Sequence, residues 1–231
     1  MESFTYHDAG QIAYAGALEM QTQAFNSLLE EKANGRQGVN KLFFCEHQPV
    51  FTLGKNAAGS NLLVSEKMLQ QQGIALYHTN RGGDITFHGP GQITGYPVFD
   101  LEYWEMGLKQ YVYVLEEIMI RFLDLYGIAA GRLKGATGVW IEPHTGRDRK
   151  ICAIGLKSSR YVTMHGFALN INTRLTHYTY INPCGFTDKG VTSLEKETGV
   201  VQDIECCKKQ LLMLFREAFP FACHPKDTTL S

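Results

Sequence analysis

The chain has 231 residues, 44% of them hydrophobic and 19% charged, which suits one globular domain with a sizeable core. Its 22 Lys and Arg against 23 Asp and Glu give a formal net charge of -1, so no general attraction to nucleic acid or to a membrane is implied. The N-terminus lacks a basic segment followed by an apolar run, and no stretch approaches the roughly 18–20 apolar residues of a membrane span. The six cysteines form neither a disulfide framework nor a CxxC zinc half-site. We therefore expect a single domain over residues 1–231 in a reducing cytoplasm, without a metal site.

Three segments have the apolar period of a helix. The first spans residues 18–29. The clearest spans residues 108–126, where apolar residues recur every three or four positions until Gly127 supplies a stop. The third spans residues 203–219 and places Cys207 on its apolar side, so we expect this cysteine in the core.

Strand-like runs lie between these helices. The order is helix, several strands, helix, several strands, helix, which favours an α+β domain over alternating βαβ units. We expect a mixed, mostly antiparallel sheet flanked by helices, with a hairpin over residues 141–155. The runs are KLFFCEH (41–47), PVFTLG (49–54), IALYHTN (74–80), DITFHG (84–89), TGYPVFDL (94–101), GVWIEP (138–143), KICAIGLK (150–157) and FALNIN (167–172).

The densest motif is RGGDITFHGPGQITGYPVFDL, residues 81–101. Its five glycines within 15 residues interrupt a strand pattern, which indicates a backbone that bends and lets a ligand approach closely. Arg81, Thr86, His88 and Gln92 supply polar groups beside that backbone, as in a ligand pocket. A tight hairpin without a ligand is the alternative. The spacing is not that of a phosphate-binding loop.

A basic segment, GRDRKICAIGLKSSR, follows at residues 146–160. It holds one acid, Asp148, among Arg147, Arg149, Lys150, Lys157 and Arg160. A solvated hairpin tip is the usual interpretation of such a charge run. Lys150 stands at the mouth of an apolar strand, where partial desolvation would favour the neutral amine that can accept a proton.

Two further motifs contain residues that can take part in catalysis. MHGFALNIN, residues 164–172, joins His165 to glycine and small apolar residues, and this histidine fits a structural role and a site role equally well. INPCGF, residues 181–186, puts Cys184 between a proline that restricts the chain and a glycine that lets it turn. Such a cysteine is either a buried small hydrophobe or an accessible nucleophile.

The runs RGGxxTFHGPGQ, KIxAIG, HGFALN and NPCG occur in this order and resemble the lipoyl(octanoyl) transferases of the biotin and lipoate protein ligase superfamily. The resemblance spans residues 46–192 and implies a biotin/lipoate protein ligase-like fold. It implies that Cys184 carries the acyl thioester and that Lys150, 34 residues earlier, is the catalytic lysine. It also implies an acyl-binding set: Arg81, Gly82, Gly83, Asp84, Ile85, Thr86, Phe87, His88, Ala153, Ile154, Gly155, Gly166, Phe167 and Ala168.

The implied reaction is the first step of endogenous protein lipoylation. Octanoyl-acyl carrier protein would pass its octanoyl group to Cys184, and from there to a lysine on lipoyl domains of 2-oxoacid dehydrogenase complexes and the glycine cleavage H protein. The resemblance implies no cofactor, ATP or metal. The phosphopantetheine group arrives on the carrier protein and does not belong to the enzyme. Lys150 would act as proton acceptor or as stabiliser of the thiolate. Small residues at Gly155, Gly166 and Ala168 would leave room for the acyl chain. The resemblance also implies acidic carrier proteins and lipoyl domains, which the basic segment 146–160 would contact.

Two other functions are compatible with parts of this pattern. An ATP-dependent lipoate or biotin protein ligase of the same fold would not need Cys184, and a non-catalytic acyl-binding module would use it only structurally. A cysteine hydrolase is a weaker alternative, because it would need no amine acceptor and would release free octanoate. The Cys184 and Lys150 pair at the family's spacing favours the transferase.

Overall fold

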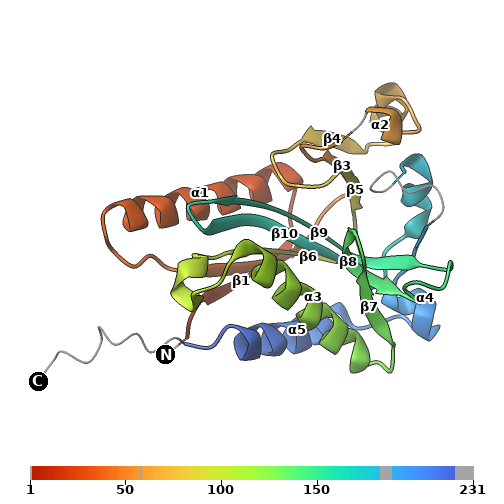
Figure 1. The fold of residues 1–231 in the computed structure, drawn as a ribbon. Coiled ribbons are helices and arrows are strands. Elements are labelled where there is room, and N and C mark those ends of the chain that lie inside the picture. The colour runs from red at the N-terminus through yellow and green to blue at the C-terminus, as the bar shows by residue number, and fades with distance from the viewer. Residues whose placement is uncertain (1, 58, 183–188, 222–231) are drawn as a thin grey trace, which may run out of the picture.

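The computed structural model describes residues 2–57, 59–182 and 189–221, which form two sheets with helices around them (Figure 1). The main sheet has the order β1-β2-β6-β10-β9-β8-β7, with β11 paired to β9. The second sheet has the order β4-β3-β5 and lies above one end of the main sheet in Figure 1. Within the described residues only the pairs β1–β2, β9–β11 and β3–β4 are parallel. This is the mixed, mostly antiparallel sheet that the sequence predicts.

The elements follow one another along the chain with short connections. The strands are β1 (Thr5–Gln11), β2 (Lys41–Glu46), β3 (Val50–Leu53), β4 (Ala75–His78), β5 (Ile85–His88), β6 (Gln92–Val98), β7 (Ala130–Leu133), β8 (Ala136–Ile141), β9 (Arg149–Ser159), β10 (Val162–Asn170) and β11 (Gly190–Val191). The helices are α1 (Tyr14–Ala33), α2 (Glu66–Gln71), α3 (Leu108–Asp124), α4 (Leu194–Thr198) and α5 (Ile204–Ala218), with 3₁₀ turns η1 (Gly59–Asn61), η2 (Leu101–Trp104) and η3 (Leu175–Tyr180).

Helices cover both faces of the main sheet (Figure 1). Helices α3 and α5 pack on one face, where the fully buried Leu115, Met119 and Phe122 of α3 join the largest apolar cluster. Helix α1 packs on the other face over β6 and β10. A third cluster lies beneath the small sheet and includes Ile181. The open part of the second face, between the two sheets, is where a pocket can form.

Several details differ from the sequence-based expectation. A polar strand, β1, precedes the first helix, and the short helices α2 and α4 were not predicted. Helix α3 has the expected range, but Leu108 in its first turn is 42% exposed and does not reach the core. Cys207 is fully buried, as predicted. Helix α5 begins where the Asp203 carboxylate accepts hydrogen bonds from the Glu205 and Cys206 backbone N–H groups.

The described residues include no helix that is both long and apolar enough to cross a membrane. They also include no group of three or more His, Cys, Asp or Glu residues that could hold a metal ion. Cys45, Cys152, Cys206 and Cys207 are free thiols.

Candidate active site

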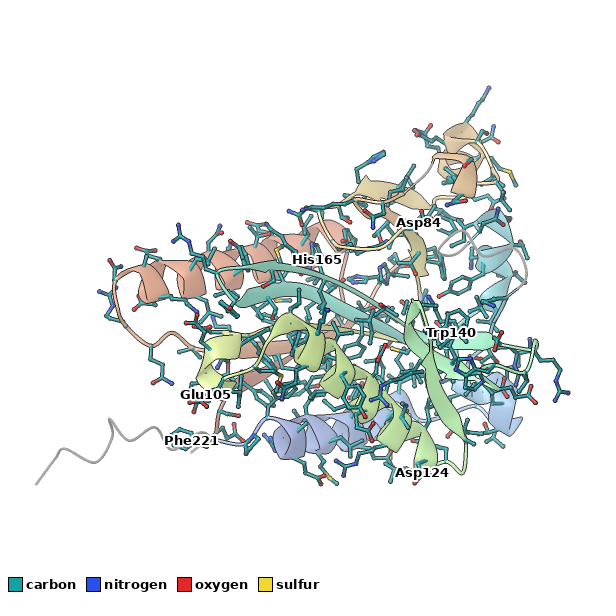
Figure 2. All side chains as sticks on the ribbon, in the orientation of Figure 1. Asp84, Glu105, Asp124, Trp140, His165 and Phe221 are labelled. Carbon is teal, nitrogen blue, oxygen red and sulfur yellow. The ribbon has the colours of Figure 1, made fainter. Side chains whose placement is uncertain are left out.

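A pocket lies between the main sheet and the segment that leads into β5. Strands β6, β9 and β10 supply its floor, and residues 81–88 supply its cover. In Figure 2, Asp84 marks the cover, His165 lies in β10 beneath it, and Trp140 lies in β8. The lining residues are Tyr14, Arg81, Gly83, Asp84, Ile85, Thr86, His88, Thr94, Tyr96, Lys150, Ala153, Ile154, Gly155, His165, Gly166, Phe167, Ala168, Asn170, Tyr178 and Val191.

The cover sits directly on the edge of β9. The Gly82 backbone N–H donates to the Leu156 carbonyl at 2.7 Å. A Cβ atom at Gly155 would lie 2.9 Å from the Gly82 carbonyl oxygen and 3.2 Å from Arg81 Cδ. Glycine at 155 therefore permits the close contact between cover and floor, which is a different reason from the predicted one of leaving space for a ligand.

Arg81 is a buried cation that fixes the cover to β3. Its guanidinium donates from Nη2 to the Thr52 carbonyl at 2.6 Å, from Nε to Thr52 Oγ1 at 3.2 Å and from Nη1 to the Gly82 carbonyl at 3.0 Å. These bonds use the forked geometry of the side chain. Arg81 thereby holds the small sheet and residues 81–83 in one arrangement above the pocket.

A buried hydrogen-bond network crosses the floor from His88 to Asn170. His88 Nδ1 lies 2.9 Å from Gln92 Oε1, and Gln92 Nε2 donates to Asn170 Oδ1 at 2.9 Å. Because the Gln92 oxygen accepts, His88 Nδ1 carries the proton. Burial, the nearby His47 and the Arg81 charge lower the pKa of His88 well below its usual range, so the ring is neutral. The Tyr178 hydroxyl also donates to Asn170 Oδ1, at 3.3 Å.

Lys150 lies in the pocket wall near this network. Its side chain is buried, and Nζ lies 4.7 Å from the centre of the Trp140 ring, over which a cation is attracted. The Lys150 carbonyl accepts from the Thr192 N–H at 3.0 Å, which ties β9 to the chain after β11. The lysine is therefore held at one end of the pocket by packing and by its own strand.

Cys184 lies outside the described residues, but both neighbouring parts of the chain are placed. Before it, the Asn182 N–H donates to the Asn61 carbonyl at 2.8 Å. After it, β11 runs parallel to β9 and pairs Val191 with Lys150. Both flanking positions are close to the pocket, because Asn61 donates to the lining residue Asp84 and Val191 is itself a lining residue.

Cys152 is the other cysteine close in sequence to Lys150. It is fully buried in the cluster beneath α3 and α5, on the opposite face of β9 from the pocket. Burial raises the pKa of its thiol. Both features oppose a role as nucleophile, because the reactive form is an accessible thiolate.

His165 lines the other end of the pocket. It has a left-handed backbone (φ 62°), and its ring Nε2 lies 2.8 Å from Asn80 Oδ1. Burial, and then the charges of Arg81 and Lys157, lower the pKa of His165 to about 3. The ring is therefore neutral near pH 7, with its position set by hydrogen bonds.

Most of the predicted acyl-binding residues meet around this one pocket, but two do not line it. Phe87 points into the core of the small sheet, where its ring lies 5.3 Å from that of Phe51 and stacks on His177. Since side chains alternate along a strand, Thr86 and His88 face the pocket while Phe87 faces away. Gly82 lines a neighbouring groove on the outer side of the cover.

Six lining residues besides His165 were not predicted as binding residues: Tyr14, Tyr96, Tyr178, Thr94, Asn170 and Val191. Asn170 could have been found, because it ends the HGFALN run, two residues after the predicted Ala168. Tyr14 and Tyr96 carry no local signal, since an aromatic residue near a helix or strand usually belongs to the core.

The basic segment 146–160 does not form one positive surface. Arg147 pairs with Glu142 at 2.8 Å, and Arg149 pairs with both Glu142 and Glu197, at 2.5 and 3.0 Å. Lys157 lies over the Phe25 ring beneath α1. The carboxylates of Glu142 and Glu197 thus offset the positive charges of both arginines. Glu197 is distant from the turn in the sequence, so the basic segment alone does not predict this pairing.

Comparison with known proteins agrees with this architecture. The family model of the lipoyl protein ligase A/B catalytic domain matches residues 13–216. An octanoyltransferase of Parabacteroides distasonis is 66% identical over 95% of this chain and 100% of its own, and one of Bacteroides fragilis is 52% identical over 87% and 90%. The structure of a bipartite lipoate protein ligase from Thermoplasma acidophilum superposes with a TM-score of 0.68 at 15% identity, covering 94% of this chain and 84% of that chain. This likeness confirms the predicted ligase-like fold.

Proposed function

Because this chain belongs to the lipoyl protein ligase A/B catalytic-domain family, we propose that its octanoyl transfer proceeds through a thioester on Cys184, with Lys150 moving the protons. Octanoyl transfer, an acyltransferase reaction of protein lipoylation, is the activity of the chain. The pocket between the sheets is the proposed acyl site, lined by the small residues Ala153 and Ala168.

One observation carries the proposed pairing of the two catalytic residues. Strand β11 begins six residues after Cys184 and sets Val191 directly beside Lys150 on β9. The chain that follows the cysteine is therefore paired with the strand that contains the lysine. A buried lysine next to a cysteine can accept the thiol proton or stabilise the thiolate.

In the first half-reaction the Cys184 sulfur attacks the carbonyl carbon of the octanoyl thioester. The C–S bond to phosphopantetheine breaks, and the thiol proton passes through Lys150 to the departing sulfur. One thioester replaces another, so the step needs no ATP. Burial of the acyl chain contributes roughly 0.8 kcal/mol per CH₂ group at most.

In the second half-reaction a neutral lysine ε-amine of the acceptor attacks the same carbonyl carbon. A C–N bond forms, the C–S bond to Cys184 breaks, and the amine proton passes through Lys150 to the cysteine sulfur. An amide replaces a thioester, so the step is downhill. We propose octanoyl-acyl carrier protein as donor and lipoyl domains as acceptors; in support, the Thermoplasma acidophilum ligase structure is described together with an E2 lipoyl domain.

The test is to incubate the enzyme with octanoyl-acyl carrier protein in the absence of ATP and to measure the mass of the intact enzyme by mass spectrometry. We expect one octanoyl adduct that hydroxylamine removes and that a lipoyl domain takes up as an amide. Cys184→Ala should abolish adduct and transfer, while Cys206→Ala, at an exposed thiol on α5, should change neither.

Other outcomes would identify other functions. A requirement for ATP would indicate a ligase, and release of free octanoate without an acceptor would indicate a hydrolase. Bound octanoate without any covalent product would indicate an acyl-binding module. An adduct on Cys152 would contradict the assignment of Cys184.

A further inference from the structure

A surface groove lies on the outer side of the pocket cover. It has an apolar floor made of Leu108 and Val112 from the start of α3, Ala136 from β8, and Ile154 and Leu156 from β9. Leu108 is 42% exposed, so the apolar stripe of α3 continues one turn beyond the core and into this groove. An apolar stripe left open at a surface marks a place of contact.

Three exposed lysines are the sequence neighbours of residues that line the groove. Lys55 precedes the lining residue Asn56, Lys109 follows Leu108, and Lys134 precedes Gly135. Over the described chain, none of these three ammonium groups lies within 4 Å of a carboxylate. By contrast, the arginines at the 142–149 turn are paired with Glu142 and Glu197. The groove thus has an apolar floor and a basic rim, defined by Lys55, Lys109 and Lys134, without ion pairs among the described residues.

The groove is also joined to the acyl pocket. Gly83, Ile154 and Gly155 line both. The Lys55 N–H donates to the Arg81 carbonyl at 2.9 Å, and the Asn56 N–H donates to the Gly83 carbonyl at 3.1 Å, so one rim loop is bonded directly to the cover. A partner seated in the groove would touch the wall of the acyl site.

From these observations we infer that the groove is the docking surface for the octanoyl donor, an acidic protein that presents an apolar side chain to the floor and carboxylates to the three lysines. The inference rests on the proposed function. Charge complementarity of this kind speeds encounter and selects the partner.

The position of the groove suits a donor. One end of the groove lies at Thr137, next to Gly138, where a Cβ atom would lie 3.6 Å from Lys150 Cε. The other end lies at Leu156, six residues along β9 from Lys150, a span of about 20 Å. A donor that carries its acyl group on a long prosthetic arm can rest its protein body along this groove and pass the arm towards Lys150.

The experiment compares two charge-reversal variants with the same change in net charge. Lys55→Glu with Lys134→Glu alters the rim, and Lys67→Glu with Lys209→Glu alters exposed lysines on α2 and α5. Adduct formation is followed with two donors, octanoyl-acyl carrier protein and protein-free octanoyl-pantetheine, and transfer is followed with the lipoyl domain as variable substrate.

We expect the rim variant to raise KM for the carrier protein by about tenfold or more, with kcat unchanged and with octanoyl-pantetheine used normally. Added salt should raise KM for the carrier in the wild type and far less in the rim variant. The control variant should behave as the wild type.

Four results would overturn the inference: an unchanged KM for the carrier in the rim variant, the same increase in the control variant, an equal loss with octanoyl-pantetheine, or an increase confined to KM for the lipoyl domain. In each case an octanoyl-pantetheine adduct on Cys184 would leave the proposed function standing. If neither donor acylates the wild type, the proposed function fails, and the docking site fails with it.

Discussion

The pocket has a buried cation at each end, and the two are held in different ways. Arg81 donates hydrogen bonds from all three of its guanidinium nitrogens to Thr52 and Gly82. Lys150 lies over the Trp140 ring, on the strand that β11 joins to the segment containing Cys184. An arginine in a protein keeps its proton, whereas a buried lysine can release one.

This difference separates two tasks that a positive charge in a pocket can perform. Arg81 fixes the cover over the pocket, and burial together with its charge lowers the pKa values of His88 and His165. Lys150 is the residue to which we assign proton transfer. Substitutions at the two positions should therefore affect different measurements.

The largest effect should come from Lys150. We expect Lys150→Ala and Lys150→Arg each to fold and to lose transfer by roughly 10²-fold or more, the range for loss of a general acid–base group. Arginine keeps the charge but cannot accept the proton. Lys150→Ala should also slow alkylation of Cys184 at neutral pH, because less thiolate would be present.

Near-normal transfer in Lys150→Arg would leave Lys150 only an electrostatic role. Lys150 would then act, like Arg81, as a fixed positive charge. Near-normal transfer in Lys150→Ala would remove this lysine from the mechanism. Lys157, beneath α1, would then be the next residue to test.

Arg81→Lys should give a smaller effect, mainly on stability and binding. The substitution keeps the charge but loses the fork, so buried acceptors of Thr52 and Gly82 lose partners, at a cost of about 1–3 kcal/mol in the free energy of unfolding. We expect KM for octanoyl-pantetheine to rise while kcat changes less than about tenfold. Arg121→Lys, on exposed α3 surface, is the matched control.

A loss in kcat as large as that of Lys150→Ala, with stability intact, would place Arg81 in the chemical step and end the division of tasks.

The sequence predicts one side of the pocket better than the other. Lys150, Ala153 and Gly155 lie in one run, so their motif identifies the β9 wall. Tyr14 and Tyr96 come from distant elements that meet only because β6 lies between β2 and β10, and strand order cannot be read from local patterns.

Other differences also have physical reasons. Strand β1 is missing from the prediction because its residues, TYHDAGQ, lack an apolar alternation; it is recruited at the sheet edge by pairing with β2. Leu108 continues the apolar period of α3 but is exposed. Periodicity predicts which face of a helix is apolar, but not where the elements that cover this face end. The position of Phe87 could have been predicted, because side chains alternate along the strand DITFHG and Phe87 therefore faces away from the side of Thr86 and His88.

The pH dependence of stability tests whether burial and the nearby positive charges keep the His165 ring neutral in the folded protein. Its pKa is about 3 in the folded protein and about 6.5 when unfolded. The unfolded chain therefore binds the proton first as the pH falls, and stability is lost from about pH 6.5 towards pH 3. At pH 5 this costs about 2 kcal/mol relative to a residue that does not titrate.

We expect His165→Asn, which tolerates the left-handed backbone, to lose less stability than the wild type between pH 7 and pH 5. Urea unfolding at both pH values measures the difference, and His47 and His88 cancel because both proteins contain them. Equal pH dependence in the two proteins would mean that His165 is not held neutral by its surroundings.

The smallest effect should come from Arg147, at the turn where the sequence concentrates positive charge. Its side chain is 74% exposed and paired with Glu142, which also holds Arg149. Arg147→Ala should leave the urea midpoint and KM for the carrier protein unchanged, because exposed ion pairs contribute little. Lys134→Ala removes the same charge from the groove rim, where no carboxylate lies within 4 Å among the described residues, and should raise that KM by about two- to threefold. If Arg147→Ala raised this KM and Lys134→Ala did not, the docking surface would lie at the 142–149 turn, which leads into the strand that contains Lys150, and not at the groove.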